Sequence, residues 1–118
     1  MIKVYVAGPY SCRARCEYGV DLTAMQRGID ACARLLSLGY APYCPWLDYQ
    51  FRLCRHGQFI DRSLFYQMSL AWLEVSDAMF IMDRHISLGV QDEIDFASEK
   101  GIPIYYDFED FIKNNPIE

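Results

Sequence analysis

Positive charge is scarce in this sequence. Its 118 residues include 11 lysines and arginines against 16 aspartates and glutamates, which leaves a formal net charge of −5. Proteins that bind nucleic acid polymers neutralise phosphates with clustered basic side chains. The charge balance therefore argues against a nucleic-acid-binding protein. The scattered arginines still suffice for one phosphate of a small ligand, because a single anion needs only one or two guanidinium groups.

Long apolar runs and a signal-peptide layout are missing as well. The longest hydrophobic stretches are of strand length, and residues 1–4 lead directly into one of them. We therefore expect a cytoplasmic protein that does not bind membranes. The length fits one domain, residues 1–118, with a single hydrophobic core.

The sequence also lacks the patterns of disulfide frameworks and metal sites. Its five cysteines are an odd number at irregular spacings, without a CxxC pair, and the two histidines do not stand at metal-ligand spacing from them. We interpret the cysteines as reduced thiols that act as small hydrophobic side chains. The sequence predicts no metal site and no cofactor.

Strand and helix patterns alternate along the chain. The strand-like runs cover residues 2–7, 40–44, 77–82 and 102–106, and the helical patterns cover residues 14–38, 64–75 and 90–100, with a short closing helix from residue 108. This order is typical of a parallel sheet with helices on both faces. The sequence therefore predicts a single-domain α/β protein, a flavodoxin- or Rossmann-like three-layer sandwich with four to five parallel strands.

The second predicted helix has an N-cap candidate and an apolar stripe. Asp61 precedes the first apolar residues and can cap the helix. Met68, Trp72 and Val75 recur at helical spacing. We expect these three side chains to face the core.

Ligands of such sheets bind outside the carboxyl ends of the strands, which directs attention to the loop after the third strand. There Gly89 permits a tight turn, Ser87 lies near the helix start, and Glu93 falls in the first helical turn, at the rim of the sheet. The positive helix end keeps such a carboxylate ionised, and an ionised carboxylate beside a sugar can act as a nucleophile. Glu93 can equally well only complement the helix dipole.

Several segments resemble the nucleoside 2-deoxyribosyltransferase family, which includes the 2'-deoxynucleoside 5'-phosphate N-hydrolases. They are residues 5–10 (YVAGPY), 70–77 (LAWLEVSD), 87–93 (SLGVQDE) and 101–103 (GIP). The resemblance implies that Glu93 attacks C1' of a (deoxy)ribose and that Ser87 and Gly89 hold a 5'-phosphate. It also implies a sugar and base pocket lined by the end of the first strand and the loop after it, with Tyr5, Ala7, Gly8, Pro9 and Tyr10.

The second predicted helix departs from the family pattern. Members usually carry an aspartate where this chain has Ser69, and a serine can hydrogen-bond a sugar hydroxyl but supplies no charge. A different substrate, weak catalysis and a purely binding role all stay open. Asp77 is a second acidic position that is shared with the family, but a turn residue that opens a strand explains it equally well.

Two functions with a nucleoside or nucleotide ligand therefore remain in view, beside a purely structural role as an oligomer-forming domain that only the aromatic C-terminus suggests. The first is cleavage or transfer at the N-glycosidic bond of a (deoxy)nucleoside or nucleoside 5'-monophosphate. The alternative is a non-catalytic module that binds a nucleotide or nucleotide-sugar on the same fold.

We also expect a homodimer or higher homo-oligomer. The family resemblance implies a pocket shared between subunits, and large rings crowd the central loop and the second helix. Aromatic side chains of this kind are enriched at association surfaces. They are Trp46, Tyr49, Phe51, Phe59, Phe65 and Tyr66.

Overall fold

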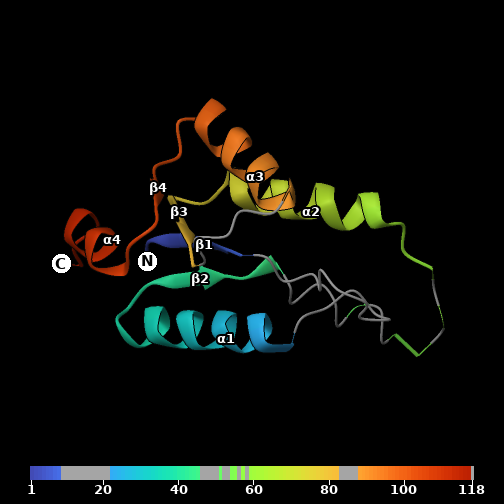
Figure 1. Cartoon of the computed structure of the whole chain (residues 1–118), viewed down its shortest axis with the longest axis horizontal. Helices are drawn as coiled ribbons and strands as arrows, with labels where there is room; N and C mark the ends of the chain where they lie inside the picture. The colour runs from blue at the N-terminus through green and yellow to red at the C-terminus, as the bar shows by residue number, and fades with distance from the viewer. Residues whose placement is uncertain are drawn as a thin grey trace.

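Four strands alternate with four helices in the part of the chain that the computed structural model describes, which comprises residues 1–8, 22–45, 51, 54–55, 57, 59–82 and 88–117. In chain order these elements are β1 (Lys3–Ala7), α1 (Leu22–Ser37), β2 (Ala41–Tyr43), α2 (Arg62–Glu74), β3 (Ala78–Ile81), α3 (Leu88–Glu99), β4 (Ile104–Tyr105) and α4 (Phe108–Asn114) (Figure 1). The predicted alternation is confirmed, except that residues 14–21 of the first predicted helix lie outside the described residues.

The strands form one parallel sheet in the order β2-β1-β3-β4. In the central strand, Tyr5 stands opposite Tyr43 of β2 and Met79 of β3. All four residues of β3 are buried, as are the last four of β1. Parallel strands that are covered on both faces have such near-continuous apolar sequences. This confirms the predicted α/β class with four parallel strands.

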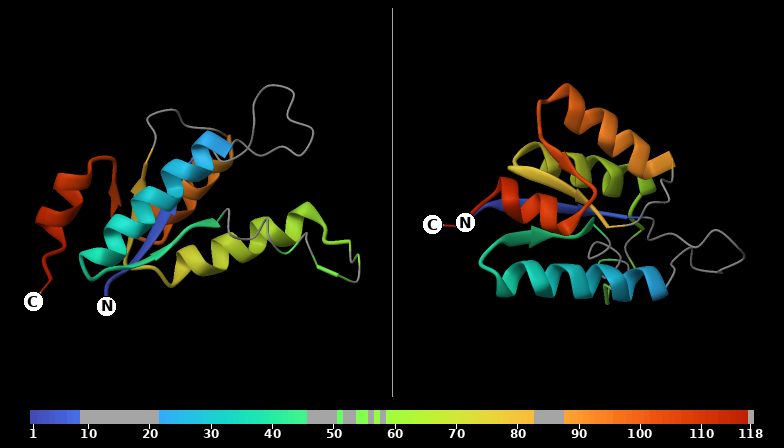
Figure 2. Two further views of the ribbon diagram at one scale, coloured as in Figure 1. Left: turned by 90° about the horizontal axis from the view of Figure 1, so that it is seen from below. Right: turned by 60° about the vertical axis from the view of Figure 1, so that its left-hand side comes forward.

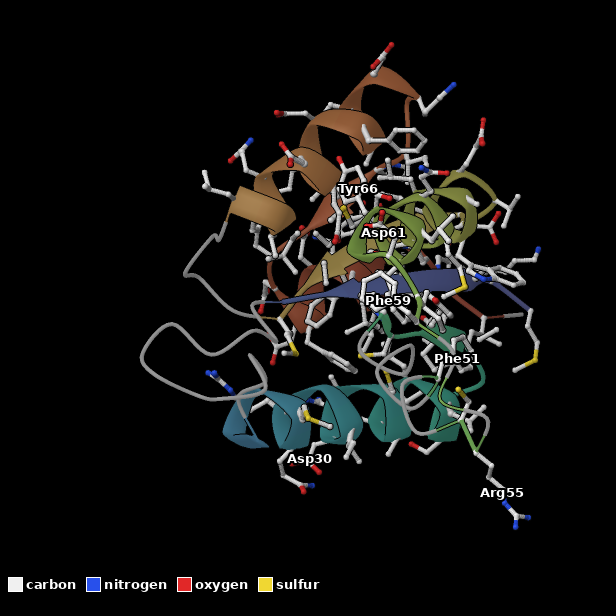
Figure 3. All side chains as sticks on the ribbon, turned by 90° about the vertical axis from the view of Figure 1, so that its right-hand side faces the viewer. Asp30, Phe51, Arg55, Phe59, Asp61 and Tyr66 are labelled. Carbon is white, nitrogen blue, oxygen red and sulfur yellow. The ribbon has the colours of Figure 1, made fainter. Side chains whose placement is uncertain are left out.

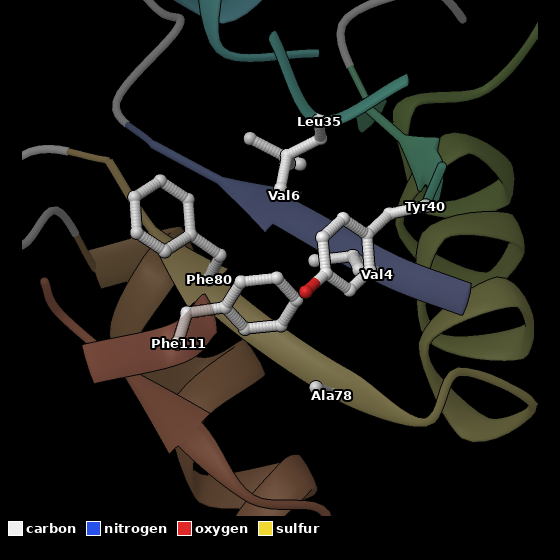
Figure 4. Close-up of a cluster of buried hydrophobic side chains, with 7 residues drawn as sticks. All are labelled: Val4, Val6, Leu35, Tyr40, Ala78, Phe80 and Phe111. Atoms are coloured by element: carbon white, nitrogen blue, oxygen red, sulfur yellow. The ribbon is translucent and has the colours of Figure 1, made fainter. Parts of the chain in front are cut away.

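Helices cover both faces of the sheet, which gives three layers (Figure 2). Side chains alternate along a strand, so β1 sends Val4 and Val6 to one face and Tyr5 and Ala7 to the other. The first face packs against α1 and α4 in a cluster of Val4, Val6, Leu35, Tyr40, Ala78, Phe80 and Phe111 (Figure 4). The second face packs against α2 and α3 in a cluster of Tyr5, Ala7, Leu73, Met79, Ile81, Val90 and Ala97.

The cap of α2 was predicted correctly, but its buried face was not. The carboxylate of Asp61 accepts a hydrogen bond from the N–H of Ser63 at 3.1 Å. Trp72 and Val75, however, are 50% and 55% exposed, while Leu73 is fully buried and Ser69 is only 8% exposed. Apolar residues occur all around α2, so periodicity alone did not single out the face that the sheet covers.

No helix within the described residues is long and apolar enough to span a membrane. The helices of this part of the chain serve as the outer layers of the sandwich.

Candidate functional site

Glu93 lies on the buried face of α3. The helix begins at Leu88, two residues earlier than expected, so Glu93 falls in its second turn rather than its first. Glu93 also follows Val90 by three residues and precedes Ala97 by four, which places it on the stripe that packs on the sheet. Its Oε2 atom has no contact with solvent. The expectation of a carboxylate at the rim is therefore wrong, and the spacing of Val90 and Ala97 was a signal that could have shown it.

Three polar side chains meet between the sheet and the two helices above it. Tyr5 comes from β1 and is fully buried, Ser69 comes from α2, and Glu93 comes from α3. The Tyr5 hydroxyl lies near both other side chains, and each of them shifts its pKa. We call Tyr5, Ser69 and Glu93 the buried polar triad.

Two buried oxygen atoms of the triad lack a hydrogen-bond partner among the described residues. Neither Tyr5 Oη nor Glu93 Oε2 has a partner among the described residues that meets both the distance and the angle of a full hydrogen bond, although their proximity is enough to shift the pKa of each. A buried polar atom without a partner costs about 1–3 kcal/mol and calls for an explanation. A ligand that supplies the missing partners is one such explanation.

The pKa of Glu93 is set mainly by burial. Removal from water raises it from 4.5 to about 7, the nearby Tyr5 hydroxyl opposes this rise, and the charge of Asp92 adds to it. The expectation that the helix end keeps this carboxylate ionised is therefore corrected, because desolvation outweighs the dipole. Burial and the Glu93 charge raise the pKa of Tyr5, which stays a neutral hydroxyl at ordinary pH.

Aromatic rings border the triad. The Tyr5 ring lies 5.7 Å from that of Tyr43, which in turn lies 5.7 Å from the half-exposed ring of Trp72. Tyr66 is exposed on α2 (Figure 3). Its pKa is raised first by the partial loss of solvent around it and then by the charges of Asp92 and Glu93. Sequence reasoning missed Tyr43, Trp72 and Tyr66 as neighbours of the site. Tyr43 carried a usable signal, because it ends a strand at the edge where ligands bind.

Other residues expected in the site lie near the ends of β1 and α3. Ala7 is buried on the same face as Tyr5, and Gly8 follows it. A Cβ on Gly8 would meet Met82 Cε at 2.5 Å, so only glycine fits there unless Met82 moves. Gly89 lies within the first turn of α3, which corrects the expected tight turn. Pro9, Tyr10 and Ser87 were expected in the site but lie outside the described residues.

Asp77 lies at the amino ends of the strands, away from the triad. Its Oδ2 accepts a hydrogen bond from Lys3 N–H at 2.8 Å, and its own N–H donates to the Lys3 carbonyl at 2.8 Å. It also borders a cavity of about 480 Å³ formed by Met1, Ile2, Gly39, Asp77, Pro116 and Ile117. The expectation that Asp77 joins the substrate site is corrected, because its carboxylate ties β1 to the start of β3.

Comparisons with known proteins identify a family and two similar structures. A family model described as "Domain of unknown function (DUF7768)" matches residues 2–107. The structure is similar to that of a 2-deoxyribosyltransferase from Bacillus psychrosaccharolyticus, with a TM-score of 0.64, 17% identity, and coverage of 98% of this chain and 93% of that one. It is also similar to a conserved protein from Enterococcus faecalis V583, with a TM-score of 0.63, 20% identity, and coverage of 98% and 76%. No curated protein matches the sequence. At such identities the structural likeness shows a shared fold.

We predict that the native state loses stability as pH rises from about 4.5 to 7. In this range native Glu93 keeps a proton that the unfolded chain has released, because its pKa is raised from 4.5 to about 7. The free energy of unfolding should therefore fall by about 3 kcal/mol and level off above pH 7. Glu93→Gln should remove this loss, so that it is more stable than wild type at pH 8 and similar at pH 4.5. Urea unfolding at several pH values measures the effect.

Asp95→Asn provides the matched control, since Asp95 is exposed on the same helix. This variant should keep the pH dependence of the wild type. An equal loss of stability with pH in the Gln variant and the wild type would contradict the assignment to Glu93.

Proposed function

Since the chain belongs to the family described as "Domain of unknown function (DUF7768)", we propose its function from its fold and its buried polar triad: cleavage or transfer at the N-glycosidic bond of a (deoxy)nucleoside or nucleoside 5'-monophosphate. The observation that carries the proposal is the buried Glu93 carboxylate, which adjoins the Tyr5 hydroxyl. The fold shared with a 2-deoxyribosyltransferase supports it.

The proposed reaction has two steps at C1' of the sugar. In the first, an oxygen of ionised Glu93 attacks C1', the bond from C1' to the base nitrogen breaks, and the base leaves with the electron pair and takes a proton from water. In the second, water or another base attacks C1' and loses a proton, and Glu93 is released. A pKa of about 7 suits this role, because a sizeable fraction of Glu93 is ionised at neutral pH and is a stronger base than an ordinary carboxylate.

The remaining residues bind the substrate in this proposal. Tyr5 orients the nucleophile through its hydroxyl, and Ser69 hydrogen-bonds a sugar hydroxyl. The positive N-terminal end of α3 suits a 5'-phosphate held by Ser87 and Gly89. We assign the rest of the sugar and base pocket to Ala7, Gly8, Pro9 and Tyr10, of which the last two lie outside the described residues.

We predict that the purified chain releases free base from at least one member of a panel of nucleosides and 5'-monophosphates, as detected by chromatography. Glu93→Gln should lower the release by at least about 10³-fold, because an amide cannot act as the nucleophile. Asp95→Asn, an exposed change of the same chemistry on the same helix, should retain the wild-type rate.

The alternative of a binding module is favoured by one observation, the neutral Ser69 at a buried position of the triad. Thermal stabilisation by a nucleotide without any base release would support that module and contradict the enzyme. Wild-type turnover in Glu93→Gln would exclude Glu93 as the nucleophile.

We further predict that the Tyr5 hydroxyl tunes the pH dependence of base release. Its hydrogen-bonding interaction lowers the pKa of Glu93, so Tyr5→Phe should raise that pKa and move the midpoint of the kcat/KM profile to higher pH. The rate at pH 6 should fall several-fold and recover in part at pH 8.5.

Tyr40→Phe is the matched control on the opposite face of the sheet. The Tyr40 hydroxyl donates to the Asn115 carbonyl at 2.6 Å, so its loss should cost about 1 kcal/mol of stability without moving the pH midpoint. Identical midpoints in Tyr5→Phe and the wild type would show that Tyr5 does not act on Glu93.

We also propose that the chain self-associates. The support is a group of exposed aromatic rings at one end of the molecule. Phe51, Phe59 and Tyr66 are all exposed (Figure 3), Phe59 by 90%, while Phe65 is half-buried. Trp46 and Tyr49 lie outside the described residues. Exposed aromatic clusters are typical of association surfaces.

We therefore predict a dimer or larger assembly by light scattering at micromolar concentration. Phe59→Ser should shift it toward monomer, because a polar side chain removes apolar surface from the interface. Ile29→Ser, an exposed apolar residue on α1, is the control and should not change the mass. A monomeric and fully active wild type would contradict the proposal.

A further inference from the structure

Two cysteines, neither of them in a disulfide, stand opposite each other where α1 turns into β2. Cys32 lies five residues before the end of α1, and Cys44 directly follows β2. Gly39, with φ 98°, reverses the chain between the two elements, and α1 packs along β2 (Figure 1). Five helical residues span about 7.5 Å and three strand residues span about 10 Å, so both cysteines lie at a similar level on either side of the turn.

The two thiols are in contact and differ in exposure. The Cys32 side chain lies close enough to that of Cys44 for the neighbouring thiol to lower the pKa of Cys32, against the opposing effect of burial. Cys44 is 1% exposed, whereas Cys32 is half-buried at the edge of the core. The pair therefore combines a partly exposed cysteine whose pKa is lowered with a buried cysteine beside it.

We propose that Cys32 and Cys44 form an oxidisable dithiol site, which a small peroxide converts into an intramolecular disulfide. The Cys32 thiolate attacks one peroxide oxygen, the O–O bond breaks, and the departing hydroxide takes a proton to become water, which leaves a sulfenic acid on Cys32. The Cys44 sulfur then attacks the Cys32 sulfur, the S–O bond breaks, and a second water leaves. One hydrogen peroxide thus takes two electrons from the two thiols.

The fold leaves room for the small movement that bond formation needs. A disulfide requires an S–S distance of about 2.05 Å and Cα atoms within roughly 7 Å. β2 is three residues long, lies at the edge of the sheet, and pairs only with β1 among the described strands. It can therefore shift toward α1 while the pairing of β1 with β3 stays intact.

Disulfide formation would also change the surroundings of the buried polar triad. Cys44 follows Tyr43 in the chain, and the Tyr43 ring contacts the Tyr5 ring at a tilt of 36°, beside Glu93. A shift of Cys44 toward α1 moves Tyr43 and so changes the surroundings of the Tyr5 hydroxyl. This effect on turnover rests on the proposed function, whereas formation of the disulfide does not.

The test treats the full chain with hydrogen peroxide, blocks the remaining thiols by alkylation, and maps the peptides by mass spectrometry. We expect a Cys32–Cys44 cross-linked peptide with a mass lower by two hydrogens, which dithiothreitol reverses. Cys54→Ser, which removes a third free cysteine, should form the same cross-link. Cys44→Ser should instead accumulate a Cys32 sulfenic acid that dimedone traps.

The thermal midpoint gives an independent readout, because a disulfide that closes this loop restricts the unfolded chain. Oxidised wild type should melt at a higher temperature than reduced wild type, and Cys44→Ser should show no such rise. The proposal is overturned if Cys32 and Cys44 are alkylated as in untreated protein, if either links only to another cysteine, or if oxidation yields only intermolecular dimers. None of these readouts depends on base release.

Discussion

The burial of one tyrosine hydroxyl under two helices is the constraint on which the site depends. β1 is an inner strand of the sheet with both faces covered, so the side chains of its last four residues must fit a packed interior. Tyr5 is the position at which this strand carries a polar atom into the core. Helices α2 and α3 each place one polar residue, Ser69 and Glu93, on a face that is otherwise apolar. A polar group at such a place costs stability unless it is paired.

The sequence predicted the layers of the fold well because burial on both faces leaves a strong pattern. The run 78–81 is apolar throughout, as a parallel strand between two helical layers requires. The same logic failed for α2, where Trp72 and Val75 were expected in the core. The helix is apolar on several sides, so only the tertiary packing decides that Ser69 and Leu73 face the sheet.

The proximity of Tyr5, Ser69 and Glu93 was predictable from the sequence, but their electrostatics were not. All three were expected in the site, and they come together from three elements that lie far apart in the sequence. The charge state of Glu93 could not be inferred from its place near a helix start, because desolvation depends on what covers the carboxylate. Asp77 shows the opposite case. Its acidic character suggested the site, but the parallel register of β1 and β3 places it at the other edge of the sheet.

The neutral Ser69 makes Glu93 the single acidic member of the triad, which affects how the proposed reaction would be driven. Without a second carboxylate there, desolvation is the main cause of the raised pKa, and the cost of ionising Glu93 is about 3 kcal/mol. That cost falls when positive charge develops at C1', because opposite charges attract more strongly in a medium of low polarity than in water. A neutral ground-state sugar gains little from the same carboxylate. In the proposed reaction, the buried position of Glu93 would therefore favour the charged transition state over the bound substrate, which is the condition for catalysis rather than for tight binding.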